Sequence, residues 1–365
     1  MAVKIVRQAN SIALLGVPTS AASLAAGHER APAALRAAGL VDRLREAGFA
    51  VTDHGDCVER AYAPDEEHPR ARNVGPVLAG LEELRPKVEV AVKSAALPVV
   101  LGGDNTVVLA TIAGCRRYYR HVGLIYLDRD AGLNVPASTP SGCVDGMVIS
   151  HVIGRGAPEL VRFWGEPPLV REPDVALFGI ERLDQPEEQF LTHSPLRRYP
   201  AYEISRRGAS VVAEEALERV HGLRHEFVLH IDLDVIAGED FLATNLSAPG
   251  GMRWEQLEQA LAVFVRQPTL AALEISAYNP ALDPDGAAAQ RVVELLVKTL
   301  ALRLPAPAAS VPPAAEQTAE AAVSADSPAP SPATTIEAPA DGAGDSASAD
   351  AAPPGEPPKS DTAAD

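Results

Sequence analysis

Two pairs of aspartates stand where apolar segments end. Asp128 and Asp130 follow the run VGLIYL, and Asp232 and Asp234 follow EFVLHI. The members of each pair are two residues apart, so both carboxylates of a pair point to the same side of an extended strand. Buried carboxylates repel one another unless a positive charge lies between them. The spacing therefore favours a divalent-cation site built from these four acids.

The same acids have a second interpretation. An aspartate that follows a strand can cap the next helix or accept backbone hydrogen bonds without binding a metal. A single pair would be weak support for a metal, but two pairs at two strand ends favour it. The alternative is a plain assembly protein that binds no metal, and metal analysis of the purified protein separates the two.

The elements that would position these acids alternate along the chain. Seven short runs rich in Val, Ile and Leu predict strands, at 11–18, 49–56, 97–103, 122–128, 174–180, 226–234 and 269–276. Four segments with helical spacing lie between or after them, at 31–48, 74–95, 254–267 and 286–304. This alternation favours a parallel sheet with helices on both faces. The polar sequences GGDN, DRD and DLD should then converge at the carboxyl ends of the strands.

The composition divides the chain into two parts. We expect residues 1–303 to form one α/β domain, because the apolar runs end there. Residues 304–365 are mainly Ala, Pro, Ser and acids, with no aromatic residue. Such a segment cannot bury enough apolar surface to offset its conformational entropy. We therefore predict a disordered tail over 304–365.

Composition also excludes several classes of protein. The formal net charge is −17, which argues against a nucleic-acid partner. We expect no membrane span, because no apolar stretch approaches the required length of roughly 18 residues. The three cysteines, Cys57, Cys115 and Cys143, are scattered. They form no disulfide framework, which favours a cytoplasmic location.

From about residue 10 to residue 303 the chain resembles the ureohydrolase family, which comprises arginase, agmatinase, formiminoglutamase and relatives. The resemblance lies in LLGVPTSAASLAAGHERAPAALRAAGL, VVLGGDN, LIYLDRDAGLNVP, SGCVDGM, ALFGIERLDQPEE, HIDLDV, APGGM and YNPALDPDG. It implies a three-layer α/β/α fold with a central, mostly parallel sheet, and a homo-oligomer. Family members bind two Mn²⁺ ions bridged by a hydroxide, which attacks a guanidinium-type carbon and releases urea or an analogue.

The metal-binding motifs depart from the family pattern. Asn105 replaces the histidine of the family's GGDH, and an amide oxygen is a poor substitute for imidazole. Where the family has Asp, His and Asp, the chain has Asp128, Asp130 and Gly132. By resemblance, the acids that remain for one metal position are Asp128, Asp130, Asp232 and Asp234. We therefore expect one divalent cation, Mn²⁺ or Mg²⁺, and not a full two-manganese cluster. Asn105 and His230 are possible additional ligands, although His230 is better explained as a core histidine bonded to a neighbouring loop.

The substrate side also departs from the family. Asp145 stands at the position of a histidine that is thought to shuttle protons, and an exposed aspartate has a pKa too low for that role. Ala277 stands where arginase-type members have a glutamate that binds the guanidinium, and the nearby Glu274 is expected to be structural. Asn134 and Ser141 match loop positions that contact the amino-acid end of the substrate.

Other side chains could in principle replace the lost catalytic groups. Cys143 and His151 could form a thiol–imidazole pair, but a separation of eight residues does not establish that they lie close together, and we do not expect a cysteine hydrolase. His28, in GHER, is expected on a surface turn. The leading hypothesis is a pseudoenzyme that binds a small ligand or a partner, with ureohydrolase activity lost or strongly reduced. The alternative is an active one-metal C–N hydrolase of an unusual guanidino or formimino compound.

Overall fold

A single parallel sheet organises the part of the chain that the computed structural model describes, namely residue 5, residues 7–221 and residues 225–305. Its eight strands have the order β2-β1-β3-β8-β7-β4-β5-β6, and all neighbours are parallel. The strands are β1 (Ser11–Gly16), β2 (Ala50–Asp56), β3 (Leu97–Leu101), β4 (Val122–Leu127), β5 (Val175–Ile180), β6 (Arg197–Pro200), β7 (Glu226–Asp232) and β8 (Leu270–Ser276). The predicted fold class is confirmed. From residue 306 onward the predicted tail lies outside the described residues.

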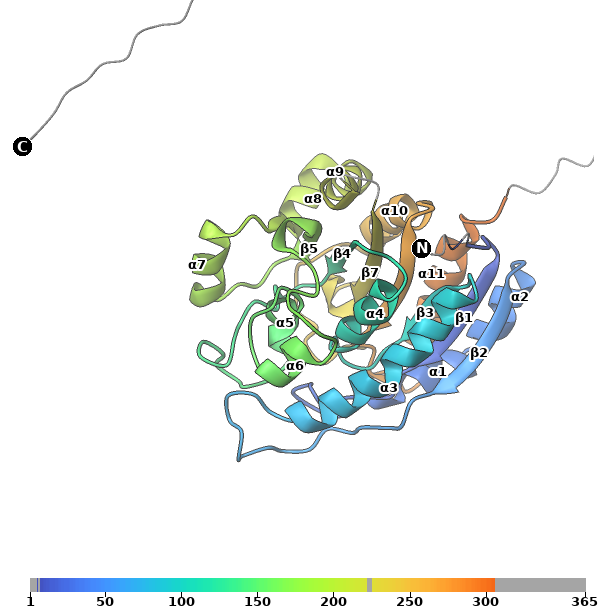
Figure 1. The fold of residues 1–365 in the computed structure, drawn as a ribbon. Coiled ribbons are helices and arrows are strands. Elements are labelled where there is room, and N and C mark those ends of the chain that lie inside the picture. The colour runs from blue at the N-terminus through green and yellow to red at the C-terminus, as the bar shows by residue number, and fades with distance from the viewer. Residues whose placement is uncertain (1–4, 6, 222–224, 306–365) are drawn as a thin grey trace, which may run out of the picture. The chain divides into compact units, whose positions relative to one another are not determined.

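Helices cover both faces of the sheet (Figure 1). One face packs against α3 (Val74–Lys93), α4 (Val107–Arg116), α5 (Val148–Val152) and α6 (Pro158–Arg162). The other packs against α1 (Ala31–Ala37), α2 (Leu40–Glu46), α8 (Ala201–Arg207), α9 (Ala209–His221), α10 (Trp254–Val265) and α11 (Ala287–Ala301). A further helix, α7 (Gln185–His193), follows β5. These are the three layers that the sequence predicted.

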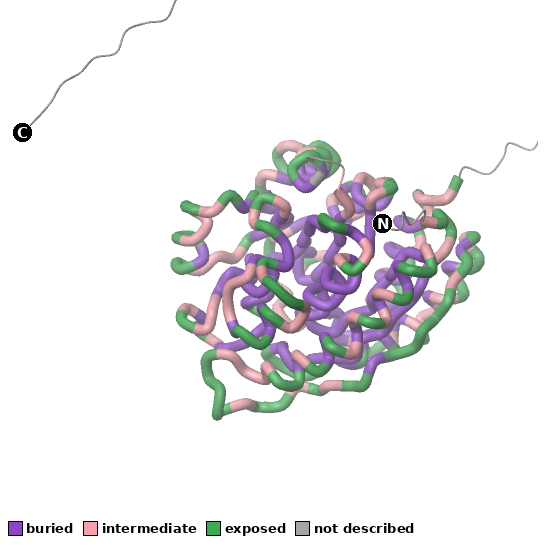
Figure 2. Tube along the Cα trace, in the orientation of Figure 1, coloured by how far each residue is buried: buried purple, intermediate pink, exposed green. Residues whose placement is uncertain are grey.

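The central strands are buried on both sides, as Figure 2 shows. In β4, Ile125 and Leu127 enter one apolar cluster, whereas Leu124 and Tyr126 enter the other. This alternation follows from the two-residue period of a strand. It explains why the strands read as continuous apolar runs and not as alternating ones. The polar residues that follow each run are consequently placed at the carboxyl edge.

The structure differs from the predicted elements in several places. The strand β6 was missed because RRYP is short and lies at the edge of the sheet. The predicted helix 31–48 is two helices, α1 and α2, because Gly39 adopts a φ of 88°. The predicted strand 226–234 ends at Asp232, and Leu233–Val235 form a 3-10 turn. That turn changes the direction of the second acid of the pair.

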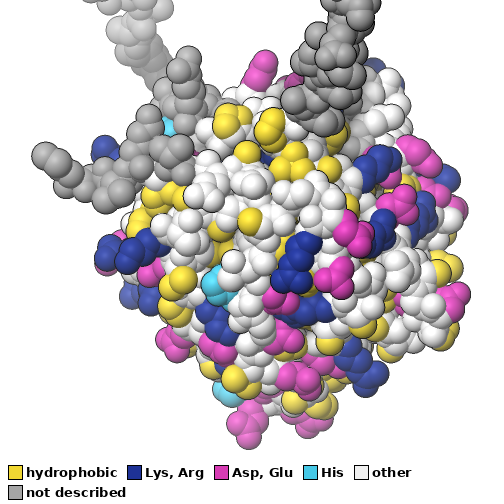
Figure 3. Space-filling view, turned by 90° about the vertical axis from the view of Figure 1, so that its right-hand side faces the viewer, with side chains coloured by type: hydrophobic (Ala, Val, Ile, Leu, Met, Phe, Trp, Pro, Cys, Tyr) yellow, Lys and Arg dark blue, Asp and Glu magenta, His cyan; other side chains and the backbone are white. Residues whose placement is uncertain are grey.

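The surface carries both acidic and basic side chains, as the composition of the sequence predicts. On the face shown in Figure 3, acidic and basic side chains are interspersed. No helix in the described part of the chain is long and apolar enough to cross a membrane.

Candidate metal-binding site

The predicted acids meet at the carboxyl edge of β4 and β7, which are neighbours in the sheet. Asp128 follows β4 directly, Asp232 ends β7, and Asp234 lies in the turn after it. One carboxylate oxygen from each of the three lies within 4.8 Å of the others, and all three residues are buried. Buried carboxylate oxygens are the ligands that Mg²⁺, Mn²⁺ and Ca²⁺ prefer. The donor set therefore fits one hard divalent cation.

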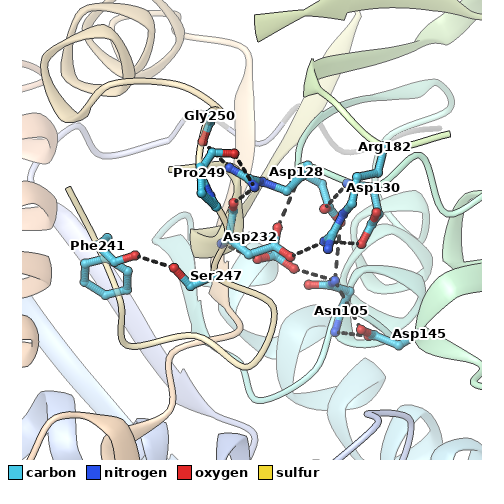
Figure 4. Close-up of polar contacts among 12 residues, drawn as sticks. Asn105, Asp128, Asp130, Asp145, Arg182, Asp232, Phe241, Ser247, Pro249 and Gly250 are labelled. Carbon is cyan, nitrogen blue, oxygen red and sulfur yellow. Dashed lines mark hydrogen bonds and ion pairs between the residues drawn. The ribbon is translucent and has the colours of Figure 1, made fainter. Parts of the chain in front are cut away.

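The fourth predicted acid, Asp130, pairs with a residue that the sequence did not single out. Its Oδ2 accepts a hydrogen bond of 2.6 Å from Nη2 of Arg182 (Figure 4). The same nitrogen lies 3.1 Å from Oδ2 of Asp234. Arg182 follows β5, and β5 pairs with β4. The pairing of these strands continues as a parallel bridge between Asp130 and Arg182. A protein cation therefore lies against two of the four acids.

Asn105 directs the amino group of its side chain at the acids. Its Nδ2 donates to Oδ2 of Asp232 at 2.7 Å and approaches Oδ2 of Asp128 at 3.4 Å. Its Oδ1 accepts from the hydroxyl of Ser276 at 2.5 Å. In this orientation Asn105 offers the acids hydrogen-bond donors and no lone pair for a metal.

His230 lies behind the acids, in contact with Asn105. Its Nδ1 is 2.9 Å from Oε2 of Glu274, and its Nε2 is 3.1 Å from Oδ1 of Asn105. Its ring stacks on Tyr126, with ring centroids 4.7 Å apart, and the Tyr126 hydroxyl donates to Oδ2 of Asp128 at 2.6 Å. Both ring nitrogens thus have partners, and Glu274 serves as a structural partner of the histidine. His230 supports Asn105 and does not face the acids.

The buried carboxylates of the site repel one another, and a positive charge between them would stabilise their ionised forms. Burial, and then the charges of Asp232 and Asp234, raise the pKa of Asp128 well above its usual value. Burial and the charge of Asp234 also raise the pKa of Asp232. The pKa of Asp130 is raised to about 6 by burial and by Asp234, although Arg182 opposes the rise. The charges of Arg182 and Arg129 both lower the pKa of Asp130 but do not cancel the rise, so a bound cation would stabilise the ionised acids.

Asp145 is not the exposed acid that the sequence analysis assumed. Its Oδ1 accepts a hydrogen bond of 2.8 Å from the backbone N–H of Asn105, which follows β3. Burial, and then the charge of Asp104, raise the pKa of Asp145 well above its ordinary value. The assumption of an ordinary pKa was wrong because the loop that carries Asp145 folds against the carboxyl edge of the sheet.

A cavity of about 160 Å³ lies over the acids, and His28 forms part of its lining. The expected surface position of His28 was wrong, because only 5% of this residue is exposed. The segment before α1 folds over the carboxyl edge of the sheet and carries His28 with it. Its Nδ1 lies 2.9 Å from the Ser23 hydroxyl oxygen, whereas its Nε2 has no hydrogen-bond partner among the described residues. A polar group left free beside a cavity can contact a ligand.

Asn134 and Ser141 border a wider hollow of about 560 Å³ beside the acids. Asn134 donates from Nδ2 to Oδ2 of Asp184 at 2.8 Å, and Ser141 accepts from the backbone N–H of Cys143 at 3.1 Å. Ser141 and Asp130 line both this hollow and the smaller cavity. The predicted ligand-contacting positions are therefore brought next to the acids.

The thiol–imidazole pair does not form. His151 has Nδ1 at 2.7 Å from the carbonyl oxygen of Met147, and its Nε2 accepts from the N–H of Ala157 at 3.1 Å. Burial raises the pKa of the Cys143 thiol to about 12. A buried protonated thiol without a partner base is not an activated nucleophile.

The match of the chain to known proteins is extensive. The Arginase family matches residues 10–301. An arginase from Bacillus subtilis (strain 168) is 29% identical over 295 residues, covering 80% of this chain and 99% of that protein. The crystal structure of an arginase from Bacillus cereus has a TM-score of 0.73 at 27% identity, covering 80% of this chain and 98% of that one. Formimidoylglutamase from Bacillus subtilis, with a TM-score of 0.66 at 19% identity over 81% of this chain and 88% of that one, shares the fold.

Proposed function

The chain belongs to the arginase family, and we propose that it holds one divalent cation and has lost most or all ureohydrolase activity. The cation is Mn²⁺ or Mg²⁺, and its ligands come from Asp128, Asp130, Asp232 and Asp234. The protein then acts as a pseudoenzyme that binds a small ligand or a partner protein in the cavity over these acids.

The observation that carries this proposal is the side chain of Asn105. Two cations together lower the pKa of a shared water and hold it as the nucleophile. A second cation beside Asp128 and Asp232 needs further lone pairs on that side of the site. Asn105 instead presents Nδ2 there, at 2.7 Å from Asp232. The orientation supports one cation, since Oδ1 of Asn105 is engaged by Ser276.

The substrate side supports reduced activity as well. Ala277 is buried and brings no carboxylate to a guanidinium. Its backbone has a φ of 65°, and its N–H donates to the carbonyl oxygen of Gly103 at 2.9 Å. Substrate orientation and nucleophile activation are separate contributions to the rate. Both are weakened in this chain, so the expected turnover is low.

A specific observation favours a second candidate function, an active one-metal C–N hydrolase of an unusual guanidino or formimino compound. His28 leaves Nε2 unpartnered beside the cavity, and its pKa is lowered by burial although the charges of Asp104 and Glu29 oppose this. A neutral imidazole can accept a proton and so serve as a general base. If turnover is found, His28→Gln should reduce kcat, whereas an unchanged kcat would exclude this role.

The test of the proposed function combines metal content with urea release. The full chain is loaded with Mn²⁺ or Mg²⁺, the bound metal is counted, and a panel of guanidino and formimino compounds is assayed. One bound ion per chain and negligible release of urea or formamide agree with the proposal, whereas no bound ion contradicts the cation site. Ordinary turnover of one compound in the panel establishes the hydrolase instead.

Two wider properties belong to the same proposal. A homo-oligomer is proposed from the family resemblance, and a cytoplasmic location is proposed from the cysteines. The location is supported by the state of Cys57, Cys115 and Cys143, which are free and buried.

A further inference from the structure

Arg182 holds a fixed place beside the acids. Its backbone N–H donates to the carbonyl oxygen of Arg129 at 3.0 Å, and the bridge to Asp130 continues the β4–β5 pairing. The position of this residue is therefore set by the sheet. Its Nη2 reaches Oδ2 of Asp130 at 2.6 Å and Oδ2 of Asp234 at 3.1 Å.

The two ion pairs occupy one oxygen atom on each of two candidate metal ligands, Asp130 and Asp234. Asp234 belongs to the group of three buried acids, and its side chain is only 4% exposed. Its other oxygen, Oδ1, accepts from the backbone N–H of Arg129 at 3.3 Å. Both oxygens of Asp234 thus already have positively polarised partners. A divalent ion that takes Oδ2 as a ligand must displace or share it with the guanidinium.

We propose that Arg182 is a built-in cation that competes with divalent metal ions for Asp130 and Asp234. In the metal-free protein the guanidinium neutralises part of the acidic cluster and keeps it folded. When a metal is present, the same charge lowers the affinity of the site and disfavours a second ion. The inference rests on the proposed one-cation site and names the residue that limits its metal content.

If Arg182 competes with metal ions, removing its charge should strengthen the binding of a divalent cation to Asp130 and Asp234. Arg182→Met keeps the aliphatic length and removes the charge, so Asp130 and Asp234 lose their partner. We expect the affinity for Mn²⁺ to rise about tenfold or more, because a hydrogen bond between charged groups no longer has to be broken. Without metal the variant should have a lower thermal midpoint than the wild type. Mn²⁺ should raise the midpoint of the variant more than that of the wild type.

The experiment uses the full chain, stripped of metal with a chelator and titrated with Mn²⁺ alone by calorimetry. Arg182→Lys retains the charge and should bind Mn²⁺ much as the wild type does. Arg171→Met is the matched control, because it removes an arginine from an exposed ion pair with Asp174 (2.7 Å). This control should leave the affinity for Mn²⁺ unchanged. If Arg182→Met does not fold, Arg182→Gln removes the same charge and carries the same expectation.

The outcomes separate this inference from the proposed function. Equal affinity for Mn²⁺ in the wild type and in the charge-removing variants overturns the role of Arg182. Two tightly held Mn²⁺ ions per wild-type chain overturn it too. Urea release at an ordinary rate from a one-ion wild type contradicts only the loss of activity, and leaves the comparison of affinities standing.

Discussion

Asn105 points its amide nitrogen, and not its oxygen, at Asp232, with 2.7 Å between Nδ2 and Oδ2. The opposite end of the same amide meets Ser276 and His230. This single side chain therefore connects the acids to the buried pair of His230 and Glu274. The relationship makes the acidic cluster part of the core as well as a candidate metal-binding site.

Removing Asn105 should destabilise the protein even without metal. Asn105→Ala removes the donor to Oδ2 of Asp232 and the acceptor that Ser276 and His230 share. Ser276 and His230 still contact each other, so the main cost is the unpaired Asp232, about 1–3 kcal/mol for a buried group. Urea-induced unfolding in a chelator should show a lower free energy of unfolding. Asn10→Ala, at an exposed position, should change it little. Equal stability of the two variants would show that the hydrogen bonds of Asn105 with Asp232, Ser276 and His230 are not formed in solution.

Asp232 should be required for metal binding. Asp232→Asn removes one carboxylate of the buried group of three. Mn²⁺ at a hundredfold excess over Kd should stabilise the wild type by about 2.7 kcal/mol, and should not stabilise the variant. Thermal unfolding with and without Mn²⁺ measures the difference. Asp42→Asn, which changes an exposed acid, should retain the full effect. A metal-induced shift that survives in Asp232→Asn would place the metal elsewhere.

The lost metal position should be recoverable. Asn105→His, Asp130→His and Gly132→Asp, combined with Arg182→Met, should allow two Mn²⁺ ions to bind. Gly132 has a φ of 61°, a left-handed conformation that aspartate tolerates better than most residues. Anomalous scattering at the manganese edge counts the ions. A single ion in the combined variant would mean that the backbone has moved out of register.

Restoring the metals alone should not restore catalysis. Urea release should stay low until Asp145→His and Ala277→Glu are added to the reconstructed site. Ala277 already has a φ of 65°, so the backbone strain of about 1–3 kcal/mol is present in the native chain and glutamate adds little to it. Full urea release before these two changes would refute the importance assigned to the substrate side.

His151 should make the protein less stable in acid. Burial lowers the pKa of His151 from 6.5 to about 4. Below pH 6.5 the unfolded chain binds the proton and the folded chain resists it, so stability falls as the pH falls towards 4. The full effect is roughly 3 kcal/mol. His151→Gln should flatten this part of the stability curve, and His193→Gln, on the exposed side of α7, should not. An unchanged slope in His151→Gln would exclude the effect.

The sequence predicted the parts of the site that depend on local pattern. Asp128 and Asp232 could be placed because each ends an apolar strand, and parallel strands share their carboxyl edge. Arg182 and His28 could not be placed in the same way. The position of Arg182 depends on which strand lies beside β4, and that of His28 depends on the path of the loop before α1. Both are long-range properties, although a basic residue two positions after the predicted strand 174–180 was a usable signal for Arg182.

Among the helices and strands, too, those with a clear local pattern were predicted and those that depend on tertiary contacts were not. The buried strands were found from their apolar runs, whereas β6 was missed because its residues are polar and at the sheet edge. The helix α4 was missed because all its residues from Val107 to Cys115 are buried, which removes the polar face that reveals an amphipathic helix. Tertiary burial, not propensity, decides such elements.

The rate of urea release by the unmodified full chain is the most direct test of the central claim. The protein is saturated with Mn²⁺, and urea is measured with arginine and with agmatine as substrates. We predict release at least about a hundredfold below an ordinary turnover of about 10 s⁻¹. Turnover of about 10 s⁻¹ or more with either compound would contradict the account, and would show that the altered residues at positions 105, 145 and 277 still support catalysis.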